Sequence, residues 1–391
     1  MSDRGADHLL RNAVEALPAG ELERKLAEGR PLRVKLGIDP TAPDIHLGHT
    51  VVLRKLREFQ DLGHVVVLIV GDYTARVGDP SGRSAARPVL APEEIDRNAE
   101  TFQEQAFAVL DRDRTEVRRN GEWLDMEMDE LFRLARTSTV AQLLERDDFA
   151  KRYAEGSPIS ILELLYPLLQ GYDSVKVRSD VELGGTDQMF NLLLAREVQK
   201  AYGVPQQVAL TMPILPGIDG VKRMSKSEGN YIGVTEPPEE TFGKAMRVPD
   251  DAMPIWYELL LGREVDPSLP AVESKRALAR ELAARFGGGE EAARRAEERF
   301  DRLHVQHELP DEIEDAVLPG EDPVHLPALL ASAFGVSRSE GRRMLAQGGV
   351  KLDGETLDGG PLDVPAADLE GRVIQLGKRR FKRLVGPGQS G

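Results

Sequence analysis

Residues 33–70 read RVKLGIDPTAPDIHLGHTVVLRKLREFQDLGHVVVLIV, and the apolar pattern of this stretch decides the fold. It begins with a short apolar segment, 33–38, and ends with a near-continuous apolar run, 64–70. Such runs are typical of strands buried on both faces of a parallel sheet. Between them Val52, Leu56 and Phe59 recur at helical spacing. Strand, helix and strand in so short a stretch predict a βαβ unit.

The rest of the chain extends this unit and then changes character. Residues 175–183 and 207–210 are further strand candidates, with a helical pattern over 187–200. We therefore predict a Rossmann-like, doubly wound parallel sheet in residues 1–234. Helical patterns and an acidic linker occupy residues 235–322. Residues 323–391 contain two short amphipathic helices, a Gly-Gly turn and a strand-like segment, which predict a small α+β domain.

Composition limits the class of protein. The 391-residue chain is 41% hydrophobic and 30% charged, as is usual for a globular protein. It has no cysteine, which excludes disulfides and thiolate metal sites. The first residues include acids and lack the apolar segment of a signal peptide, and no apolar run approaches the roughly 18 residues of a spanning helix. We expect a cytoplasmic protein with no membrane partner.

Charge is unevenly distributed. The net charge of -15 argues against indiscriminate nucleic-acid binding, because phosphate backbones repel an acidic surface. Residues 308–322 carry seven acids and no base, whereas residues 371–385 carry six bases and no acid. A basic segment in so acidic a chain suggests a local anionic partner, although a solvated charge run is the alternative.

The loop DPTAPDIHLGHT (39–50) ends in two histidines three residues apart and has three interpretations. A zinc site is disfavoured, because His46 and His49 have no cysteine and no obvious third ligand nearby. A histidine pair buried without a chemical role remains open. A phosphate cradle is favoured, because the loop follows a strand and opens a helix, whose first N–H groups attract anions. Gly48 would let a ligand approach the backbone.

A second basic motif, KRMSKS, spans residues 222–227 and lies between Gly220 and Gly229. Cations and hydroxyls between glycines predict a mobile loop that binds anions, although an ordinary surface loop is the alternative. HLGH after the first strand together with RMSKS far downstream is much more specific than either motif alone. The pair resembles the two signature motifs of class I aminoacyl-tRNA synthetases.

A third segment indicates which amino acid such a synthetase would use. Tyr166, Gln170 and Asp173 are spaced at i, i+4 and i+7, so a helix would place them on one face, amid leucines. The alternative is a buried network in which these polar side chains have their hydrogen bonds satisfied within the protein and bind no ligand. With GDPSGRS (78–84) and GGTDQ (184–188), the segment resembles tyrosyl-tRNA synthetases, and the bacterial form most closely. The resemblance runs from about residue 32 to the C-terminus and is dense through 33–234. Tryptophan-specific relatives share the fold and both signatures.

The resemblance implies a role for each matching residue. Asp173 would accept a hydrogen bond from the tyrosine phenol. The residues implied to bind tyrosine are Gly37, Asp79, Tyr166, Gln170, Asp173 and Gln188. The residues implied to bind ATP are Asp39, His46, Gly48, His49, Gly185, Asp187, Arg223, Met224, Ser225, Lys226 and Ser227. Those implied to act in catalysis are Thr41, His46, His49, Arg223 and Lys226.

The implied reaction joins tyrosine to ATP and then to tRNA(Tyr). The tyrosine carboxylate attacks the α-phosphorus, pyrophosphate leaves, and the tyrosyl group passes to the 3′ end of the tRNA. Positioning and charge stabilisation are the protein's main contributions. Mg²⁺ is expected to be carried with ATP, with no protein-bound metal. Two positions depart from the family: Lys35 replaces a common tyrosine, which leaves its role open, and Arg223 replaces a lysine.

The C-terminal part resembles a small RNA-binding domain of the S4 type. The residues implied to contact tRNA are Arg338, Arg342, Arg343, Lys378, Arg379, Arg380 and Lys382. The resemblance also implies a homodimer and an anticodon-side role for the helical domain. It further implies a helical insertion at about 88–159 that contacts the acceptor stem and the second subunit. Two other functions remain open: an adenylyl-transferring enzyme that does not use tRNA, and a non-catalytic paralogue that binds RNA.

Overall fold

The computed structural model describes residues 2–41, 44–80, 91–304, 313–357, 360–377 and 380–386. Contacts divide the chain into two compact units between Glu297 and Glu298. In these described ranges, no helix combines the length and the apolar composition needed to cross a bilayer. The division into domains 1–234, 235–322 and 323–391 stays a prediction.

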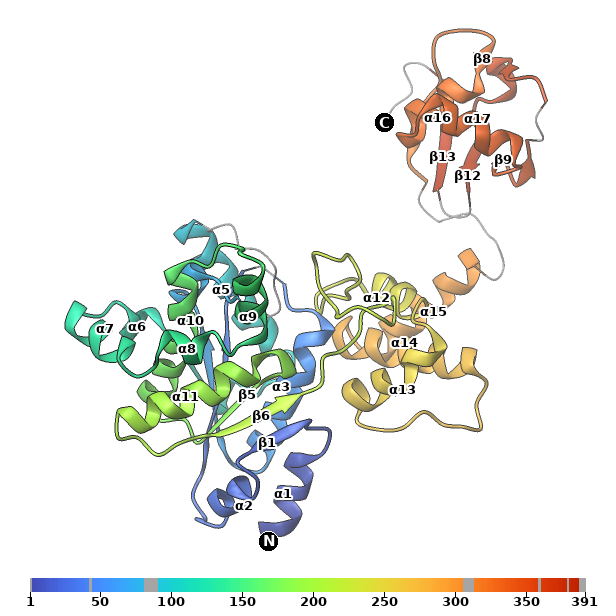
Figure 1. Cartoon of the computed structure of the whole chain (residues 1–391). Coiled ribbons are helices and arrows are strands. Elements are labelled where there is room, and N and C mark those ends of the chain that lie inside the picture. The colour runs from blue at the N-terminus through green and yellow to red at the C-terminus, as the bar shows by residue number, and fades with distance from the viewer. Residues whose placement is uncertain are drawn as a thin grey trace. The chain divides into compact units, whose positions relative to one another are not determined.

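A six-stranded sheet forms the centre of the first unit (Figure 1), in the order β1-β6-β5-β2-β3-β4. All neighbours are parallel except β1, which is antiparallel to β6. From β2 the chain adds β3 and β4 on one side and β5 and β6 on the other. This reversal is the switch point at which open α/β sheets bind ligands. The strands are β1 (Glu15–Leu17), β2 (Arg33–Ile38), β3 (Val65–Val70), β4 (Thr115–Arg119), β5 (Val181–Gly185) and β6 (Val208–Met212).

Helices cover both faces of this sheet (Figure 1). Helix α3 (Leu47–Asp61) packs on β3 and β5, while α11 (Met189–Ala201) packs on β5 and β6. Helix α10 (Ile161–Lys176) lies along α11 and begins with a capping box of Ser160 and Glu163. A Cβ on Gly171 would lie 2.9 Å from Val198 Cγ2, so the glycine permits the close approach of α10 and α11.

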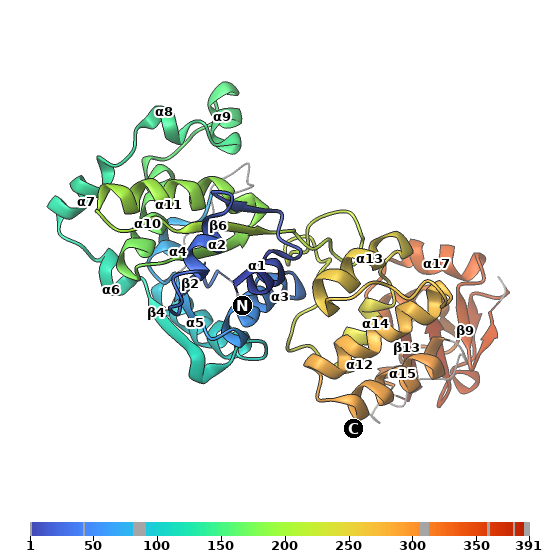
Figure 2. The ribbon, with the colours of Figure 1, turned by 90° about the horizontal axis from the view of Figure 1, so that it is seen from below.

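Two sequence predictions need correction. Residues 175–183 were expected to be a strand, but α10 continues through Lys176 and β5 begins at Val181. The segment 88–159, expected to be a helical insertion, also contributes the edge strand β4 to the sheet. Figure 2 shows α7 (Met128–Ala135) and α8 (Val140–Leu143) on the side of this unit away from the helices of residues 238–286. The helices of the segment are α5 (Pro92–Ala106), α6 (Gly121–Leu124), α7 (Met128–Ala135), α8 (Val140–Leu143) and α9 (Asp147–Ala154).

Helices make up the remainder of the first unit. At its beginning lie α1 (Ser2–Leu10) and α2 (Glu21–Leu26), and the short α4 (Thr74–Val77) follows β3. After the sheet come α12 (Pro238–Ala245), α13 (Met253–Trp256), a π-helical turn (Tyr257–Leu261) and α14 (Ala271–Phe286). Helix α15 (Glu290–His304) crosses the division between the two units.

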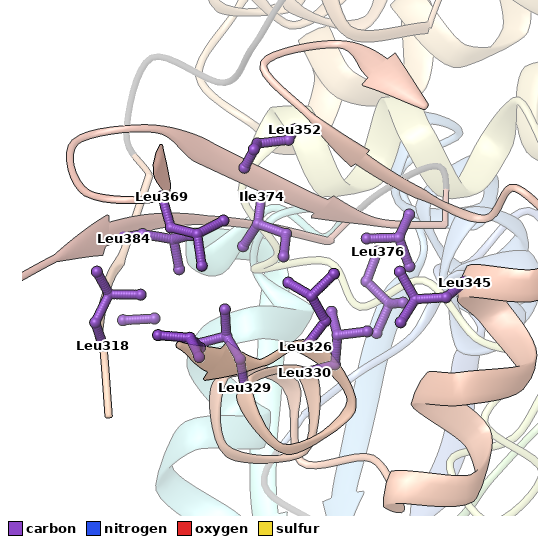
Figure 3. Close-up of a cluster of buried hydrophobic side chains, with 13 residues drawn as sticks. Leu318, Leu326, Leu329, Leu330, Leu345, Leu352, Leu369, Ile374, Leu376 and Leu384 are labelled. Carbon is purple, nitrogen blue, oxygen red and sulfur yellow. The ribbon is translucent and has the colours of Figure 1, made fainter. Parts of the chain in front are cut away.

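The second unit is a small α+β domain with its own core. Its five-stranded sheet has the order β10-β9-β12-β13-β7, and β8 pairs with β11. In Figure 3 leucines of α16 point toward Ile374, Leu376 and Leu384 on the strands. Its elements are β7 (Asp315–Val317), β8 (Val324–His325), α16 (Leu326–Phe334), α17 (Arg338–Ala346), β9 (Val350–Leu352), β10 (Glu355–Thr356), β11 (Asp363–Val364), β12 (Val373–Leu376) and β13 (Arg380–Val385).

Candidate active site

A cavity of about 500 Å³ contains side chains from the carboxyl ends of β2 and β5, at the switch point of the sheet. All the residues that the resemblance implied for tyrosine, ATP and catalysis line it. These residues are Gly37, Asp39, Thr41, His46, Gly48, His49, Asp79, Tyr166, Gln170, Asp173, Gly185, Asp187, Gln188, Arg223, Met224, Ser225, Lys226 and Ser227. Segments almost two hundred residues apart in sequence therefore meet in one cavity.

The two histidines lie at the start of α3. His46 is the N-cap residue, and its backbone N–H donates to Nδ1 of His49 at 3.2 Å. The two rings lie 3.9 Å apart between centroids. A Cβ on Gly48 would lie 3.0 Å from the His46 ring, so a side chain here would crowd the turn. Within the described ranges, no three His, Cys, Asp or Glu residues are grouped to hold a metal ion.

Both histidines are neutral near pH 7. Burial, with smaller contributions from His49 and Lys226, lowers the pKa of His46 to about 2. Burial also lowers the pKa of His49 to about 4. Nδ1 of His46 is buried without a partner among the described residues. Because the rings are uncharged, they can offer hydrogen bonds to phosphate oxygens but not a positive charge.

The floor of the cavity is built around Asp39, at the end of β2. Tyr166 Oη donates to Asp39 Oδ2 at 2.9 Å, and Thr74 Oγ1 donates to Asp39 Oδ1 at 2.6 Å. A Cβ on Gly71 would lie 2.2 Å from Asp39 Oδ1, so only glycine leaves room for this carboxylate. The arrangement ties β2, α4 and α10 together at the site.

Asp173 is buried and held by two residues that sequence reasoning missed. Trp123 Nε1 donates to Asp173 Oδ1 at 2.8 Å, and Asn120 Nδ2 donates to Oδ2 at 3.3 Å. Burial raises the pKa of Asp173 to about 7, although Lys35 and both donors act in the opposite direction. Asn120 precedes a four-residue helix that follows β4, and nothing in the local sequence marks it as part of a site. The carboxylate keeps acceptor capacity for one further donor from the cavity.

A chain of amides continues from Gln170 along the cavity wall. Asn191 Nδ2 donates to the side-chain oxygens of Gln170 and Gln188, at 3.0 and 3.1 Å. Gln188 Nε2 in turn donates to Asp79 Oδ2 at 2.8 Å. Asn191 was not expected from the sequence. Lys35, whose role was open, is fully buried behind this wall and pairs with Glu182.

Two carboxylates from other segments of the cavity lining form ion pairs with the loop that carries RMSKS. Lys226 Nζ lies 2.5 Å from Asp44 Oδ2, and Arg223 Nη1 lies 3.5 Å from Asp187 Oδ2. Asn230 Oδ1 accepts from the backbone N–H of Ser225 at 2.9 Å and so shapes the loop from within. Both cations are partly exposed, so an entering anion can exchange with these carboxylates.

The known proteins that resemble this chain are tRNA synthetases. A family model described as tRNA synthetases class I (W and Y) matches residues 27–304. The chain belongs to this family. A tyrosine–tRNA ligase of Moorella thermoacetica is 50% identical over 393 residues, covering 96% of this chain and 94% of the relative. One from Thermotoga maritima is 49% identical over 390 residues, covering 97% and 96%.

Solved structures agree on the fold of this class I synthetase. The tyrosyl-tRNA synthetase of Archaeoglobus fulgidus, complexed with L-tyrosine, matches with a TM-score of 0.63 at 24% identity. The match covers 76% of this chain and 99% of that chain. At this identity it supports the Rossmann-like fold and does not assign individual residues.

The C-terminal unit of the synthetase carries most of the predicted RNA-binding residues on its surface. Arg338, Arg342 and Arg343 are exposed on α17, and Arg380 is exposed on β13. Lys382 is half-buried and pairs with Glu314. Two further predicted residues, Lys378 and Arg379, lie outside the described residues.

Proposed function

We propose that the chain is a tyrosine–tRNA ligase, which activates tyrosine with ATP and transfers the tyrosyl group to tRNA(Tyr). The observation that carries this proposal is the surroundings of Asp173, a buried carboxylate that faces the cavity and retains acceptor capacity. A phenolic hydroxyl satisfies it, whereas phenylalanine would leave it buried and unpaired, which is unfavourable. The family also includes tryptophan enzymes, so this carboxylate is the chemical argument for tyrosine.

The rest of the cavity suits the first step of the reaction. The α-ammonium of tyrosine would lie among Tyr166, Gln170 and Asp79, with Gln188 beside the carboxylate. An oxygen of that carboxylate attacks the α-phosphorus of ATP, the bond to the bridging oxygen breaks, and pyrophosphate leaves. Thr41 and neutral His46 would donate hydrogen bonds toward the leaving phosphates, at the N-terminus of α3. Asp187 and Gly185 would hold the ribose.

The loop cations would act as the charge develops. Arg223 and Lys226 would exchange their carboxylate partners for the β- and γ-phosphates. Their contribution to the rate depends on binding the transition state more strongly than ground-state ATP. Mg²⁺ is expected to arrive on the phosphates and to neutralise part of their charge, and we assign it no ligand from the chain. In the second step a ribose hydroxyl of the tRNA attacks the tyrosyl carbonyl carbon and AMP leaves.

The tRNA and a second subunit are assigned to other surfaces. We propose that the C-terminal unit is an S4-like RNA-binding domain, supported by the exposed arginines of α17. A homodimer is supported by large apolar side chains exposed on α7–α10, among them Phe132, Val140, Tyr153 and Ile161. A protein with this role in translation is expected in the cytoplasm.

The test is amino-acid-dependent ATP–pyrophosphate exchange, with tyrosine, phenylalanine and tryptophan in parallel. Exchange with tyrosine alone, followed by charging of tRNA(Tyr), is the expected result. Exchange without tRNA charging would favour an adenylyl-transferring enzyme that does not use tRNA. No exchange from folded protein would refute the ligase and favour the RNA-binding paralogue.

A further inference from the structure

An ion pair with no assigned role lies behind the proposed tyrosine site. Lys35 on β2 and Glu182 on β5 face each other in register on adjacent parallel strands. Lys35 Nζ lies 2.8 Å from Glu182 Oε1, and the two side chains are 0% and 1% exposed. Burying two charges is unfavourable unless further hydrogen bonds satisfy them. The position of those hydrogen bonds therefore shows what the pair holds in place.

The pair is bonded to the turn of α10 that carries Gln170. Lys35 Nζ donates to the backbone oxygen of Gln170 at 2.9 Å and to Ser174 Oγ at 2.8 Å. Glu182 accepts from Gln170 Nε2 at 3.0 Å, from Ser174 Oγ at 3.0 Å, and from Gln207 Nε2. Both the main chain and the side chain of Gln170 are thus fixed from behind.

These bonds determine which end of the Gln170 amide faces the ligand. A carboxylate can only accept hydrogen bonds, so Glu182 requires the NH₂ group of Gln170 to point toward it. The amide oxygen then points the other way, where Asn191 occupies one of its two acceptor positions. The second is available to a donor in the cavity, which Gln170 lines. The α-ammonium of an amino acid is such a donor.

We infer that the Lys35–Glu182 pair positions Gln170 so that its side-chain oxygen receives the α-ammonium of tyrosine. The two residues are positioning residues, because they act through Gln170 and do not line the cavity. This inference rests on the proposed function for the identity of the amino acid. It assigns Lys35 to recognition of the amino-acid backbone, in addition to its electrostatic effect on the pKa of Asp173.

The test compares tyrosine with 3-(4-hydroxyphenyl)propanoate, which keeps the phenol and the carboxylate but lacks the ammonium. The variant Lys35→Met/Glu182→Met removes both charges and leaves no unpaired ion. A matched control is Arg152→Met/Glu163→Met, because that pair is also buried, spans 2.7 Å and includes a residue of α10 outside the cavity. The KM for tyrosine and the inhibition constant of the analogue are measured in ATP–pyrophosphate exchange with the full chain.

The wild type should bind tyrosine more tightly than the analogue. In the Lys35→Met/Glu182→Met variant this ratio of affinities should fall about ten- to a hundredfold, which is the contribution expected of a hydrogen bond to a charged group. At a pH well above 7, where Asp173 stays ionised without Lys35, the variant's inhibition constant for the analogue and its KM for ATP should stay within about twofold. The control should keep the wild-type preference. Equal weakening of tyrosine and the analogue, or an equal loss of preference in the control, would overturn the inference.

Two further experiments cover the cases in which the double variant does not fold or the wild type shows no exchange. If the double variant does not fold, Glu182→Asp keeps both charges but withdraws the carboxylate from Gln170, and it should shift the preference in the same direction. No shift in a folded Glu182→Asp protein would then count against the inference. If the wild type shows no exchange, the proposed function fails on that result alone. Calorimetric binding of tyrosine and the analogue to wild type and variant would then decide the inference separately.

Discussion

A change of pH between 6 and 8 is expected to change tyrosine affinity through Asp173. Burial raises the pKa of this carboxyl from an ordinary 3.8 to about 7. Only the ionised form, which is acceptor-only, suits a phenol that donates its proton. A pKa of about 7 leaves roughly 9% of the group ionised at pH 6 and roughly 91% at pH 8. The KM for tyrosine should therefore be about tenfold higher at pH 6 than at pH 8.

Phenylalanine supplies the internal control for this experiment. It lacks the hydroxyl but shares the ammonium and carboxylate of tyrosine, so titration of those groups cancels in a ratio. An unpaired Asp173 is less unfavourable when protonated, so phenylalanine should bind no worse at pH 6. Exchange assays with both amino acids should show the preference for tyrosine falling as the pH falls, with a midpoint near 7. A KM for tyrosine that is flat between pH 6 and 8, or that changes in parallel with phenylalanine, would refute the reasoning.

The same carboxyl should make the free energy of unfolding change with pH in the opposite direction to tyrosine affinity. Its pKa in the folded chain lies above its ordinary value. The contribution of Asp173 to the free energy of unfolding is therefore fully present below about pH 4 and is lost as the pH rises through 7. At the pH that favours tyrosine binding, Asp173 therefore contributes least to the stability of the protein without ligand.

Other substitutions test separate parts of the site. Trp123→Phe removes a hydrogen-bond donor to ionised Asp173. The midpoint of the pH dependence of the KM for tyrosine should therefore rise by about one pH unit, and an unchanged midpoint would contradict the role of the indole. Asp44→Asn frees Lys226 from a partly exposed pair, so the KM for ATP should fall about two- to fivefold at low salt, and a rise would show that Asp44 itself binds ATP. Gly171→Val overpacks two helices and should destabilise the protein by about 1–3 kcal/mol, measured by urea unfolding, and unchanged stability would show that the helices can separate.

The regular part of the fold was predictable because its signal is local. The strands β2 and β3 are buried on both faces and therefore read as apolar runs, and α3 between them shows helical spacing. The face formed by Tyr166, Gln170 and Asp173 also follows from helical spacing alone. By contrast, β4 reads TEVRR and is half-buried throughout at the edge of the sheet, so it has no apolar signature. Charged edge strands are seldom distinguishable from loops by pattern.

The partners that hold the site residues could not be predicted, because they come from distant parts of the chain. Trp123 and Asn120 reach Asp173 across about fifty residues of sequence. Lys35 is paired through strand register with Glu182, and a lone lysine in an apolar strand gives no indication of its partner. Residues 175–183 were misassigned for a related reason. The sequence does not show that α10, which packs on α11, continues to Lys176.

The charges of the cavity also suggest how a zwitterionic amino acid and a polyanionic triphosphate would take separate places under the proposed function. Asp39, Asp79 and Asp173 all interact electrostatically with Tyr166 of α10. This part of the cavity therefore favours an α-ammonium and a phenolic donor and disfavours phosphates. Another part of the cavity is formed by the N-terminus of α3, where His46 and His49 are neutral, and by the loop that carries Lys226. Under the proposed function a triphosphate would be favoured there, once it exchanges with the carboxylates paired to Lys226 and Arg223.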